Sequence, residues 1–325
     1  MMDELSVLRL LKNEDAKEKF TTLAAKDFVM DKKGIRWCPA PNCTNAIQAE
    51  LSQAKPVTCA CGMTFCFLCG NPDHPPATCE MAINWKRKLE SEGENVKFLA
   101  QNTKECPKCK ALIWKDHGCQ YMRCQQCSHA FCWLCLGAFD HKAHNCNKWT
   151  GGTDEGGERA EWNRYTFFYE RWKGHSDSAK FEKELINKAN LIIQRLTKEG
   201  MNWIDAQYIL KAAEQLKEAR QILATSYIYG FFLPKGTHVM MFENYQGFLE
   251  QATEELSQIL EDKEGKSVSE RQKVLNLTAN LKTRLDNFVD AVNQGAFKAQ
   301  VAEQTQKKSD YKIDVKYDGW IYQAN

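Results

Sequence analysis

The sequence predicts small α+β modules that depend on metal ions, followed by an all-α helical bundle. All fifteen cysteines of the 325-residue chain lie between Cys38 and Cys146, and the rest of the chain contains none. From about residue 158 onward, apolar residues recur at steps of three and four, the period of a helix with one buried face. The chain therefore divides into a cysteine-rich part and a helical part.

The N-terminal residues and the cysteine number indicate the compartment. An odd count forbids complete internal disulfide pairing, and the first twenty residues carry acids among their leucines, unlike a signal peptide. We therefore expect the cytoplasm or the nucleus, where cysteine clusters hold metal or do chemistry. Residues 1–36 contain neither cysteine nor histidine, and the helical spacing of Leu5, Leu8 and Leu11 predicts one or two short helices there.

A first cysteine module is expected over 37–80. Its spacing is C-x4-C, C-x-C, C-x2-C and H-x4-C, so eight soft ligands stand in pairs. Two tetrahedral zinc ions need eight such donors and would leave no coordination position open to substrate. Such a segment buries too little apolar surface to fold without metal. The predicted ligands are Cys38, Cys43, Cys59, Cys61, Cys66, Cys69, His74 and Cys79.

A second module is expected over 105–149, after a helical linker at 81–104. Its pattern is C-x2-C-x14-C-x2-C followed by C-x2-C-x5-H-x4-C, which fits two more closed sites and brings the expected total to four zinc ions. His144 competes with His141 for the last position, and we prefer His141 because His144 lies only two residues from Cys146. The predicted ligands are Cys106, Cys109, Cys124, Cys127, Cys132, Cys135, His141 and Cys146.

One cysteine, Cys119, is left over by this assignment. It lies in a loop that is pinned by ligand pairs at both ends, a reasonable place to display a nucleophile. Lys115 and His117 would favour its thiolate electrostatically. Two other interpretations stay open: an unreactive thiol packed against Trp114, or a ligand that takes the place of Cys124.

Four apolar stripes predict the helical bundle over 158–300, beyond a glycine-rich joint at 150–158. Gly200 is expected to end the first helix, since glycine adopts the left-handed conformation of a C-cap. The tail at 309–325 alternates with period two around an Asp-Gly pair, which predicts a small hairpin. The stripes are Phe181, Leu185, Ile192 and Leu196; Ile209, Ala213, Leu216 and Leu223; Phe242, Tyr245, Leu249, Ala252, Leu256 and Ile259; and Val274, Leu277, Leu281, Leu285, Phe288 and Val292.

Charge argues against two classes of partner. Forty-four basic and forty-two acidic residues leave a net charge of +2, which gives no large electrostatic footprint for nucleic acid or an anionic membrane. No apolar run approaches the roughly 18 residues of a membrane helix. A zinc-finger nucleic-acid binder would also leave Cys119 unexplained.

The runs IRWCPAPNC, TKECPKCKALIWKDHGC and FCWLCLG stand in the cysteine modules, and MNWIDAQYI and FENYQGFLEQATEEL stand in the bundle. These motifs resemble those of RING-between-RING (RBR) ubiquitin ligases of the Ariadne subfamily. The resemblance makes 37–80 an in-between-RING domain, 105–149 the catalytic RING-like domain and 158–300 an Ariadne domain. Those ligases begin with a conventional RING, so residues 1–36 are expected to be the linker that follows a missing first RING.

The resemblance implies acyl transfer through Cys119. A ubiquitin-conjugating enzyme would pass ubiquitin to it as a thioester, and a lysine of the substrate protein would then receive it. The histidine that usually serves as general base is replaced by Tyr121, and a nearby glutamate is replaced by Ala130. We hypothesise that His117 or His129 substitutes. Docking of the conjugating enzyme is expected to be weak without the first RING.

The resemblance also implies autoinhibition. The helical domain of the subfamily covers the catalytic cysteine until a partner, typically a neddylated cullin-RING ligase, releases it. The matching positions are Phe181, Glu182 and Glu254, although periodicity alone favours Phe181 in the core stripe and solvated glutamates. The alternative function is a non-catalytic scaffold of zinc modules and helices that binds partners of the ubiquitin system.

Overall fold

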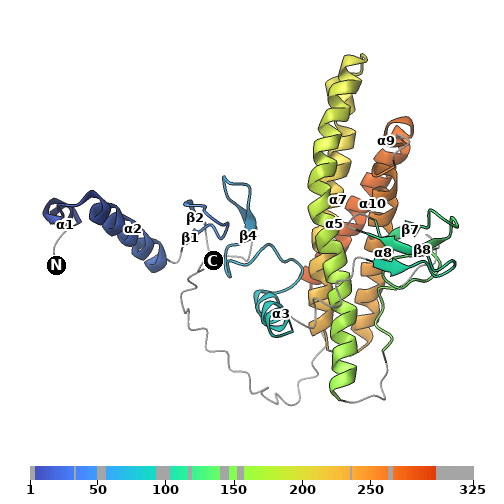
Figure 1. Ribbon diagram of the computed structural model, residues 1–325, viewed down its shortest axis with the longest axis horizontal. Helices are drawn as coiled ribbons and strands as arrows, with labels where there is room; N and C mark the ends of the chain where they lie inside the picture. The colour runs from blue at the N-terminus through green and yellow to red at the C-terminus, as the bar shows by residue number, and fades with distance from the viewer. Residues whose placement is uncertain are drawn as a thin grey trace.

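The chain folds into four small hairpins and a long helical bundle, joined through a short helix (Figure 1). The computed structural model describes residues 4–32, 34–49, 56–92, 103–115, 119–139, 146–151, 157–234, 236–262 and 266–297. The fold class expected from the sequence, metal-binding modules followed by an all-α unit, is confirmed. The hairpin predicted at 309–325 lies outside the described residues.

Two helices, α1 (Glu4–Leu10) and α2 (Glu14–Asp31), precede the first hairpin, as the leucine spacing predicts. The side chain of Asn13 caps α2 by accepting a hydrogen bond from the backbone N–H of Asp15. Both helices lie at the far end of the molecule from the bundle (Figure 1).

Each zinc module contains two antiparallel hairpins with strands of three residues. The first module pairs β1 (Ile35–Trp37) with β2 (Ala46–Gln48) and β3 (Pro56–Thr58) with β4 (Thr64–Cys66). The second pairs β5 (Thr103–Glu105) with β6 (Leu112–Trp114) and β7 (Tyr121–Arg123) with β8 (Ala130–Cys132). Hairpins this short have little apolar surface to bury, so their stability must come from the ligand clusters beside them.

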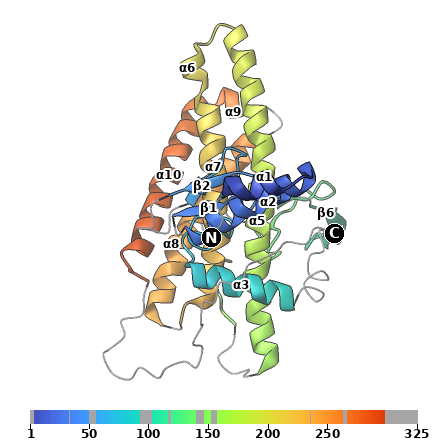
Figure 2. The same cartoon turned by 90° about the vertical axis from the view of Figure 1, so that its left-hand side faces the viewer.

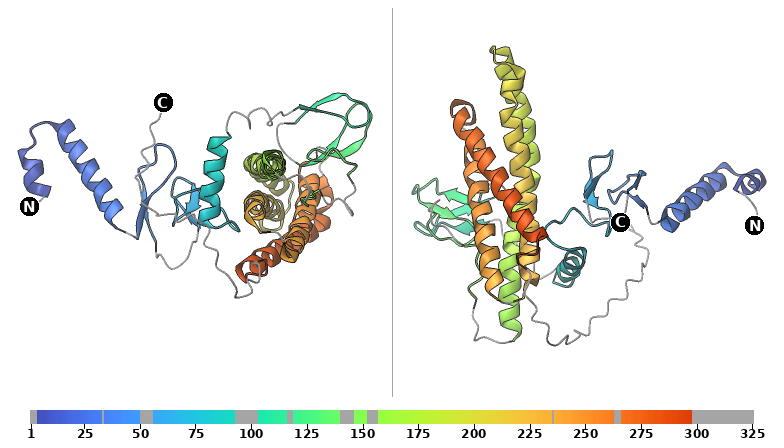
Figure 3. Two further views of the ribbon diagram at one scale, coloured as in Figure 1. Left: turned by 90° about the horizontal axis from the view of Figure 1, so that it is seen from below. Right: turned by 180° about the vertical axis from the view of Figure 1, so that it is seen from behind.

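Six helices form the C-terminal unit within the described residues: four long helices lie side by side, and the other two are single turns of four residues (Figures 2 and 3). Helix α5 is a single helix of 41 residues that ends just before Gly200, whose φ of +99° confirms the predicted stop. The helices are α5 (Glu158–Lys198), α6 (Trp203–Ala206), α7 (Tyr208–Phe232), α8 (Thr237–Leu260), α9 (Lys266–Ser269) and α10 (Arg271–Asn293).

The four predicted stripes supply the core of this unit. Leu216 on α7, Leu249 on α8 and Leu281 on α10 are completely buried. The stripe on α5 differs at two positions, since Ile193 is buried where Ile192 was expected, and Phe181 is only half-buried. None of the helices within the described residues is long and apolar enough to cross a membrane.

Helix α3 (Cys79–Ser91) joins the helical core instead of acting only as a linker. Trp85 is 2% exposed, and its ring lies 5.6 Å from Tyr165, 5.8 Å from Trp172 and 5.4 Å from Phe231, between ring centroids. Burial of one tryptophan among aromatic rings is a large apolar contribution. The helix that the sequence assigns to a linker therefore fixes the first zinc module to the bundle.

Candidate functional site

Fourteen cysteines and His74 gather into four clusters, each with its ligand atoms within 4.8 Å of one another. Sulfur atoms in these clusters lie 3.6–3.9 Å apart. Disulfide bonds are excluded, because S–S bonds measure about 2.0 Å. Four ligands at about 2.3 Å from a central zinc would be separated by about 3.8 Å, so the clusters fit tetrahedral zinc.

Three clusters contain the predicted ligand sets in full. They are Cys38, Cys43, Cys59 and Cys61; Cys66, Cys69, His74 and Cys79; and Cys106, Cys109, Cys124 and Cys127. The fourth brings together Cys132, Cys135 and Cys146, while both candidates for its last ligand, His141 and His144, lie outside the described residues.

His74 is oriented for metal by a backbone carbonyl. Its Nδ1 lies 2.8 Å from the carbonyl oxygen of Ala77, and its Nε2 lies 3.3 Å from the sulfur of Cys69. Because a carbonyl only accepts, Nδ1 must carry the proton, and the lone pair of Nε2 is then free for a metal ion. The hydrogen bond to the Ala77 carbonyl therefore supports His74 as a zinc ligand.

The cysteine turns take a backbone form that directs their sulfurs together. The residue after the second cysteine has a left-handed φ in each of four turns: +73° at Gly70, +62° at Lys110, +57° at Ser128 and +59° at Leu136. Its N–H bonds to the carbonyl of the first cysteine at 2.8–3.0 Å. The strain of three non-glycine residues in this region is offset when the turn closes on an ion.

Chelation of zinc should expose the cysteines without melting the bundle. With zinc bound, we expect a thiol-alkylating reagent to modify at most Cys119. With a strong chelator, all fifteen cysteines should react, while circular dichroism at 222 nm retains most of its helical signal. Mass spectrometry counts the modified thiols. Full alkylation before chelation would contradict the metal assignment.

Cys119 is the cysteine that no cluster uses. The possibility that it replaces Cys124 as a ligand is excluded, because the Cys124 sulfur lies 3.6 Å from that of Cys109 within a complete set. Trp114, the other expected neighbour, is 68% exposed. Cys119 precedes β7 and faces the helical unit, where it meets α8.

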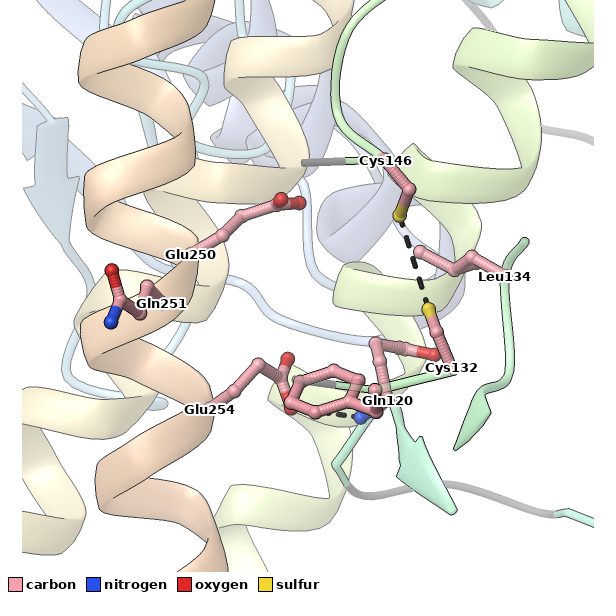
Figure 4. Close-up of a pocket in the computed structure, with 8 residues that line it drawn as sticks. Gln120, Cys132, Leu134, Cys146, Glu250, Gln251 and Glu254 are labelled. Atoms are coloured by element: carbon pink, nitrogen blue, oxygen red, sulfur yellow. Dashed lines mark hydrogen bonds between the residues drawn. The ribbon is translucent and has the colours of Figure 1, made fainter. Parts of the chain in front are cut away.

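Two carboxylates bind the loop at Cys119: Glu254, which lies on α8, and Glu261, which is the C-cap of α8. The Cys119 thiol donates to Oε2 of Glu254 at 2.7 Å. The backbone N–H of Gln120 donates to the same oxygen at 2.8 Å, and Figure 4 shows Gln120 beside Glu254. The backbone N–H of Cys119 lies 3.4 Å from Oε2 of Glu261. The helical unit therefore covers the one cysteine that is free to react.

Arg220 on α7 binds the carboxylate of Glu254 within the helical unit. Its guanidinium is fully buried and donates to Oε1 of Glu254 and, at 3.0 Å, to the hydroxyl of Ser257. Its Nε lies 3.7 Å from Glu182 of α5, which is also fully buried. One buried cation thus faces two buried carboxyl groups.

The charges set the protonation of the pair that meets at Cys119. Burial alone would raise the pKa of Glu254, but the charge and hydrogen bond of Arg220 outweigh it and lower that pKa to about 2. Burial raises the pKa of Cys119 well above its ordinary value, and the charges of Glu254 and Glu261 raise it further. At neutral pH the site therefore holds a carboxylate and an unreactive thiol.

The zinc module is also anchored beyond its last cysteine ligand. Arg171 of α5 donates to the carbonyl of Cys146 at 2.7 and 3.1 Å. The amide of Asn147 donates to the carbonyl of Glu243 at 2.6 Å, and the N–H of Trp149 donates to the Glu243 carboxylate at 3.1 Å. The module is thus bound to the bundle at both Cys119 and 146–149.

Two helix glycines admit side chains of this module. A Cβ at Gly174 of α5 would lie 3.1 Å from Nε2 of Gln120, and one at Gly247 of α8 would lie 3.2 Å from Oδ1 of Asn147. The cavity that remains between Gln120, Glu250 and Glu254 measures about 30 Å³ (Figure 4). That volume is far below the roughly 300 Å³ of a small-molecule site. The second zinc module and the helical unit are therefore packed directly against each other.

Three family models match successive parts of the chain. An IBR domain, described as a half RING-finger domain, matches residues 18–79, a second IBR domain matches 101–156, and an Ariadne domain matches 163–300. The chain therefore contains two IBR domains and an Ariadne domain. The helical unit is its Ariadne domain, so Glu254 and Arg220 are residues of the Ariadne domain that face Cys119.

Relatives that resemble this chain are named as E3 ubiquitin-protein ligases. ARIH1 of Homo sapiens is 36% identical over 80% of this chain and 49% of its own length. Ariadne-1 of Drosophila melanogaster is 34% identical over 80% of this chain and 54% of its own length, and dbl4 of Schizosaccharomyces pombe is 33% identical over 89% and 61%. The chain spans about half the length of most of these relatives.

The three residues that were expected to mask Cys119 differ in their contacts with it. Glu254 accepts a hydrogen bond from the thiol. Glu182 lies next to Arg220, which in turn binds Glu254. Both glutamates are buried, so the expectation from periodicity that they are solvated is wrong. Phe181 is half-buried with the ammonium group of Lys188 5.3 Å from its ring centroid, and no described contact links it to Cys119.

Of the two histidines that were expected to assist Cys119, the structure describes only His129. His117 lies outside the described residues. The carbonyl of His129 accepts from the N–H of Cys124, at the far end of the β7–β8 hairpin. No described contact joins His129 to Cys119, and its role as a base stays a prediction. Tyr121, at the base position, packs edge-on against Phe139.

Sequence reasoning missed the central residue of the Ariadne-domain site, Arg220. A signal was available, since Arg220 follows Leu216 by four positions and precedes Leu223 by three, which places it on the buried stripe of α7. A buried arginine is rare unless it is paired. Gln120 and Glu261 were also missed, because no local pattern marks them.

Replacement of Glu182 by glutamine should preserve or raise the stability of the Ariadne domain. Burial raises the pKa of Glu182 to about 8 against the pull of Arg220, so the carboxyl is largely neutral at pH 7. A raised pKa gives stability that is complete below the unfolded value of about 4.3 and declines as pH rises towards 8. Glutamine removes that decline.

The advantage of Glu182→Gln in thermal unfolding should therefore be larger at pH 8 than at pH 5. Unfolding is followed by circular dichroism at both pH values. An equal loss of stability at both would show that Glu182 acts as a buried anion instead.

Proposed function

We propose that this chain carries the transfer reaction of an RBR-type E3 ubiquitin-protein ligase, with Cys119 as the acceptor of ubiquitin. The observation that supports this most directly is the position of Cys119. It is the only cysteine outside the metal clusters, and an Ariadne-domain carboxylate binds its thiol at 2.7 Å. The names of the relatives, which cover the same domains, support ubiquitin as the cargo.

The reaction proceeds in two acyl transfers. The Cys119 thiolate attacks the carbonyl carbon of a thioester between ubiquitin and a conjugating enzyme, and the thiolate of that enzyme leaves. A lysine amine of the substrate protein then attacks the new thioester, Cys119 leaves as thiolate, and the amine loses a proton to water or a base. An isopeptide bond results, and Cys119 is regenerated.

Zinc supplies structure to this reaction. We infer four ions, one in each cluster, with His141 as the fourth ligand of the last cluster. In the three complete clusters all four ligands come from the protein, so no position stays open for substrate. The closed clusters hold the loop that presents Cys119 between β6 and β7.

We further propose that the Ariadne domain inhibits the transfer by holding Cys119 closed. The pKa of the half-buried Cys119 thiol is raised by burial and by Glu254, which suppresses the thiolate that attacks the thioester. A partner that binds the Ariadne domain would release it, and the family resemblance makes a neddylated cullin-RING ligase the expected partner. The reaction also requires a ubiquitin-conjugating enzyme and a substrate protein as partners.

A preactivated ubiquitin thioester of a small thiol tests the function without a conjugating enzyme. The Glu254→Ala chain should form an adduct at Cys119 that reducing agent removes. In Glu254→Ala/Cys119→Ser the adduct should become an ester that resists reducing agent. No adduct at position 119 in either protein would favour the scaffold, in which zinc modules and helices bind partners of the ubiquitin system without transfer.

A further inference from the structure

The loop at Cys119 presents three successive backbone N–H groups to anionic or sulfur acceptors. The N–H of Cys119 faces the Glu261 carboxylate at 3.4 Å, and the N–H of Gln120 donates to Glu254 at 2.8 Å. The N–H of Tyr121 donates to the sulfur of Cys119 at 3.3 Å. Successive N–H groups of this kind form a concave site for an anion.

One oxygen of Glu254 occupies a chemically specific position. Oε2 lies 2.7 Å from the Cys119 sulfur and 2.8 Å from the Gln120 nitrogen. When a thiolate adds to a carbonyl, the oxyanion on the new tetrahedral carbon lies about 2.6 Å from that sulfur, and a stabilising donor lies about 2.7–3.1 Å from the oxyanion. The carboxylate oxygen therefore satisfies both distances that the oxyanion must satisfy.

We propose that the backbone N–H of Gln120 is the oxyanion donor of the transfer reaction, and that Glu254 inhibits by imitating the oxyanion. This inference rests on the proposed function. In the step concerned, the S–C bond forms, the carbonyl π electrons move to oxygen, and the Gln120 N–H binds that oxygen until the electrons return and the departing thiolate leaves. The residue after a nucleophile supplies such a donor in α/β-hydrolases as well.

The Gln120 backbone is held in place for this role. Its carbonyl accepts from the N–H of Trp133 at 2.8 Å, and the residue is 3% exposed. This bond comes from the zinc module itself and does not depend on the Ariadne domain. It fixes the Gln120–Tyr121 peptide unit, which directly follows the donor N–H, so residue 120 keeps its place in the zinc module when Glu254 leaves.

Replacement of a single amide by an ester tests the donor. We would build the full chain with Glu254→Ala and with the α-hydroxy analogue of glutamine at position 120, which removes the N–H and keeps the side chain. Transfer from a ubiquitin thioester of a small thiol should slow by about 10²- to 10³-fold. Alkylation by iodoacetamide, which forms no oxyanion on the carbon bonded to sulfur, should change less than about twofold, because no oxyanion donor acts in it.

Unchanged transfer, or an equal loss in transfer and alkylation, would overturn the proposal. If the unmodified Glu254→Ala chain forms no thioester, the proposed function fails, and the inference fails with it. If that chain forms a thioester and the ester analogue forms it equally fast, only the inference fails.

A second measurement needs no backbone change. Carbonyl-13C cysteine with 15N-glutamine labels only the amides of Gln120 and Gln125, because these are the two Cys-Gln pairs of the chain. The Gln120 proton should move upfield in Glu254→Ala and return downfield when Cys119 adds to ubiquitin bearing a C-terminal aldehyde. Gln125 is exposed and should stay unchanged. An adduct that leaves the Gln120 signal unmoved would contradict the assignment.

Discussion

Alanine at Glu254 should increase the rate of Cys119 alkylation at pH 7.5 by at least about tenfold. The variant removes the carboxylate that accepts from the thiol and the charge that raises its pKa. It also removes the acceptor of the Gln120 N–H. Each unit by which the thiol pKa falls raises the thiolate fraction about tenfold. Iodoacetamide labelling followed by peptide mass spectrometry at Cys119 gives the rate.

Glu255→Ala is the matched control, since it makes the same change one position along α8. Glu255 accepts a hydrogen bond from Gln251 and has no described contact with Cys119. We expect its alkylation rate to equal that of the unmodified chain. Equal rates in the unmodified chain and in Glu254→Ala would show that the carboxylate does not protect the thiol.

The pH dependence of the same reaction has a definite sign. The closed state raises the pKa of Cys119, so closure keeps its full stability below the ordinary thiol pKa of about 8.5 and weakens above it. The alkylation rate of the unmodified chain should therefore continue to rise about tenfold per pH unit above pH 8.5. In Glu254→Ala the rate should level off there.

Methionine at Arg220 should destabilise the Ariadne domain by about 3–5 kcal/mol, because it leaves the buried Glu254 carboxylate without its cation. For a unit of this size that loss corresponds to roughly 10 °C in the midpoint of thermal unfolding. Circular dichroism at 222 nm follows the helices. Cys119 alkylation should increase as well, since Arg220 holds Glu254 in place.

The double variant Arg220→Met/Glu254→Gln separates loss of charge pairing from loss of packing. With no buried charge at either position, it should recover part of the stability that Arg220→Met loses. Glu182 stays largely neutral at pH 7 and adds no unpaired charge. A double variant no more stable than Arg220→Met alone would assign the effect to packing.

The metal clusters could be predicted residue by residue because their information is local. Two ligands two to five positions apart can bind only in a tight turn, so spacing nearly determines geometry, and the three complete clusters match the predicted sets. Helix stripes are similarly local, which is why Leu216 and Leu281 were placed correctly in the core. Cys119 emerged by elimination from that same pattern.

The contacts of Cys119 could not be predicted from spacing. Glu254 lies 135 positions away along the chain. No local sequence pattern around either residue indicates that the two are in contact. The preference for solvated glutamates failed because a buried cation, Arg220, reverses the usual cost of burying a carboxylate.

The anchor at 146–149 has a consequence for activation by a partner. Arg171 and Glu243 hold the end of the zinc module on the helices, so the Cys119 loop meets Glu254 as part of one molecule. A tethered contact of this kind forms at a high effective concentration, in the millimolar range for a short linker. Dilution of the protein cannot open this contact. A ligand that binds the closed and open states with equal affinity cannot open it either, however tightly it binds. Activation must come from a ligand with higher affinity for the open form.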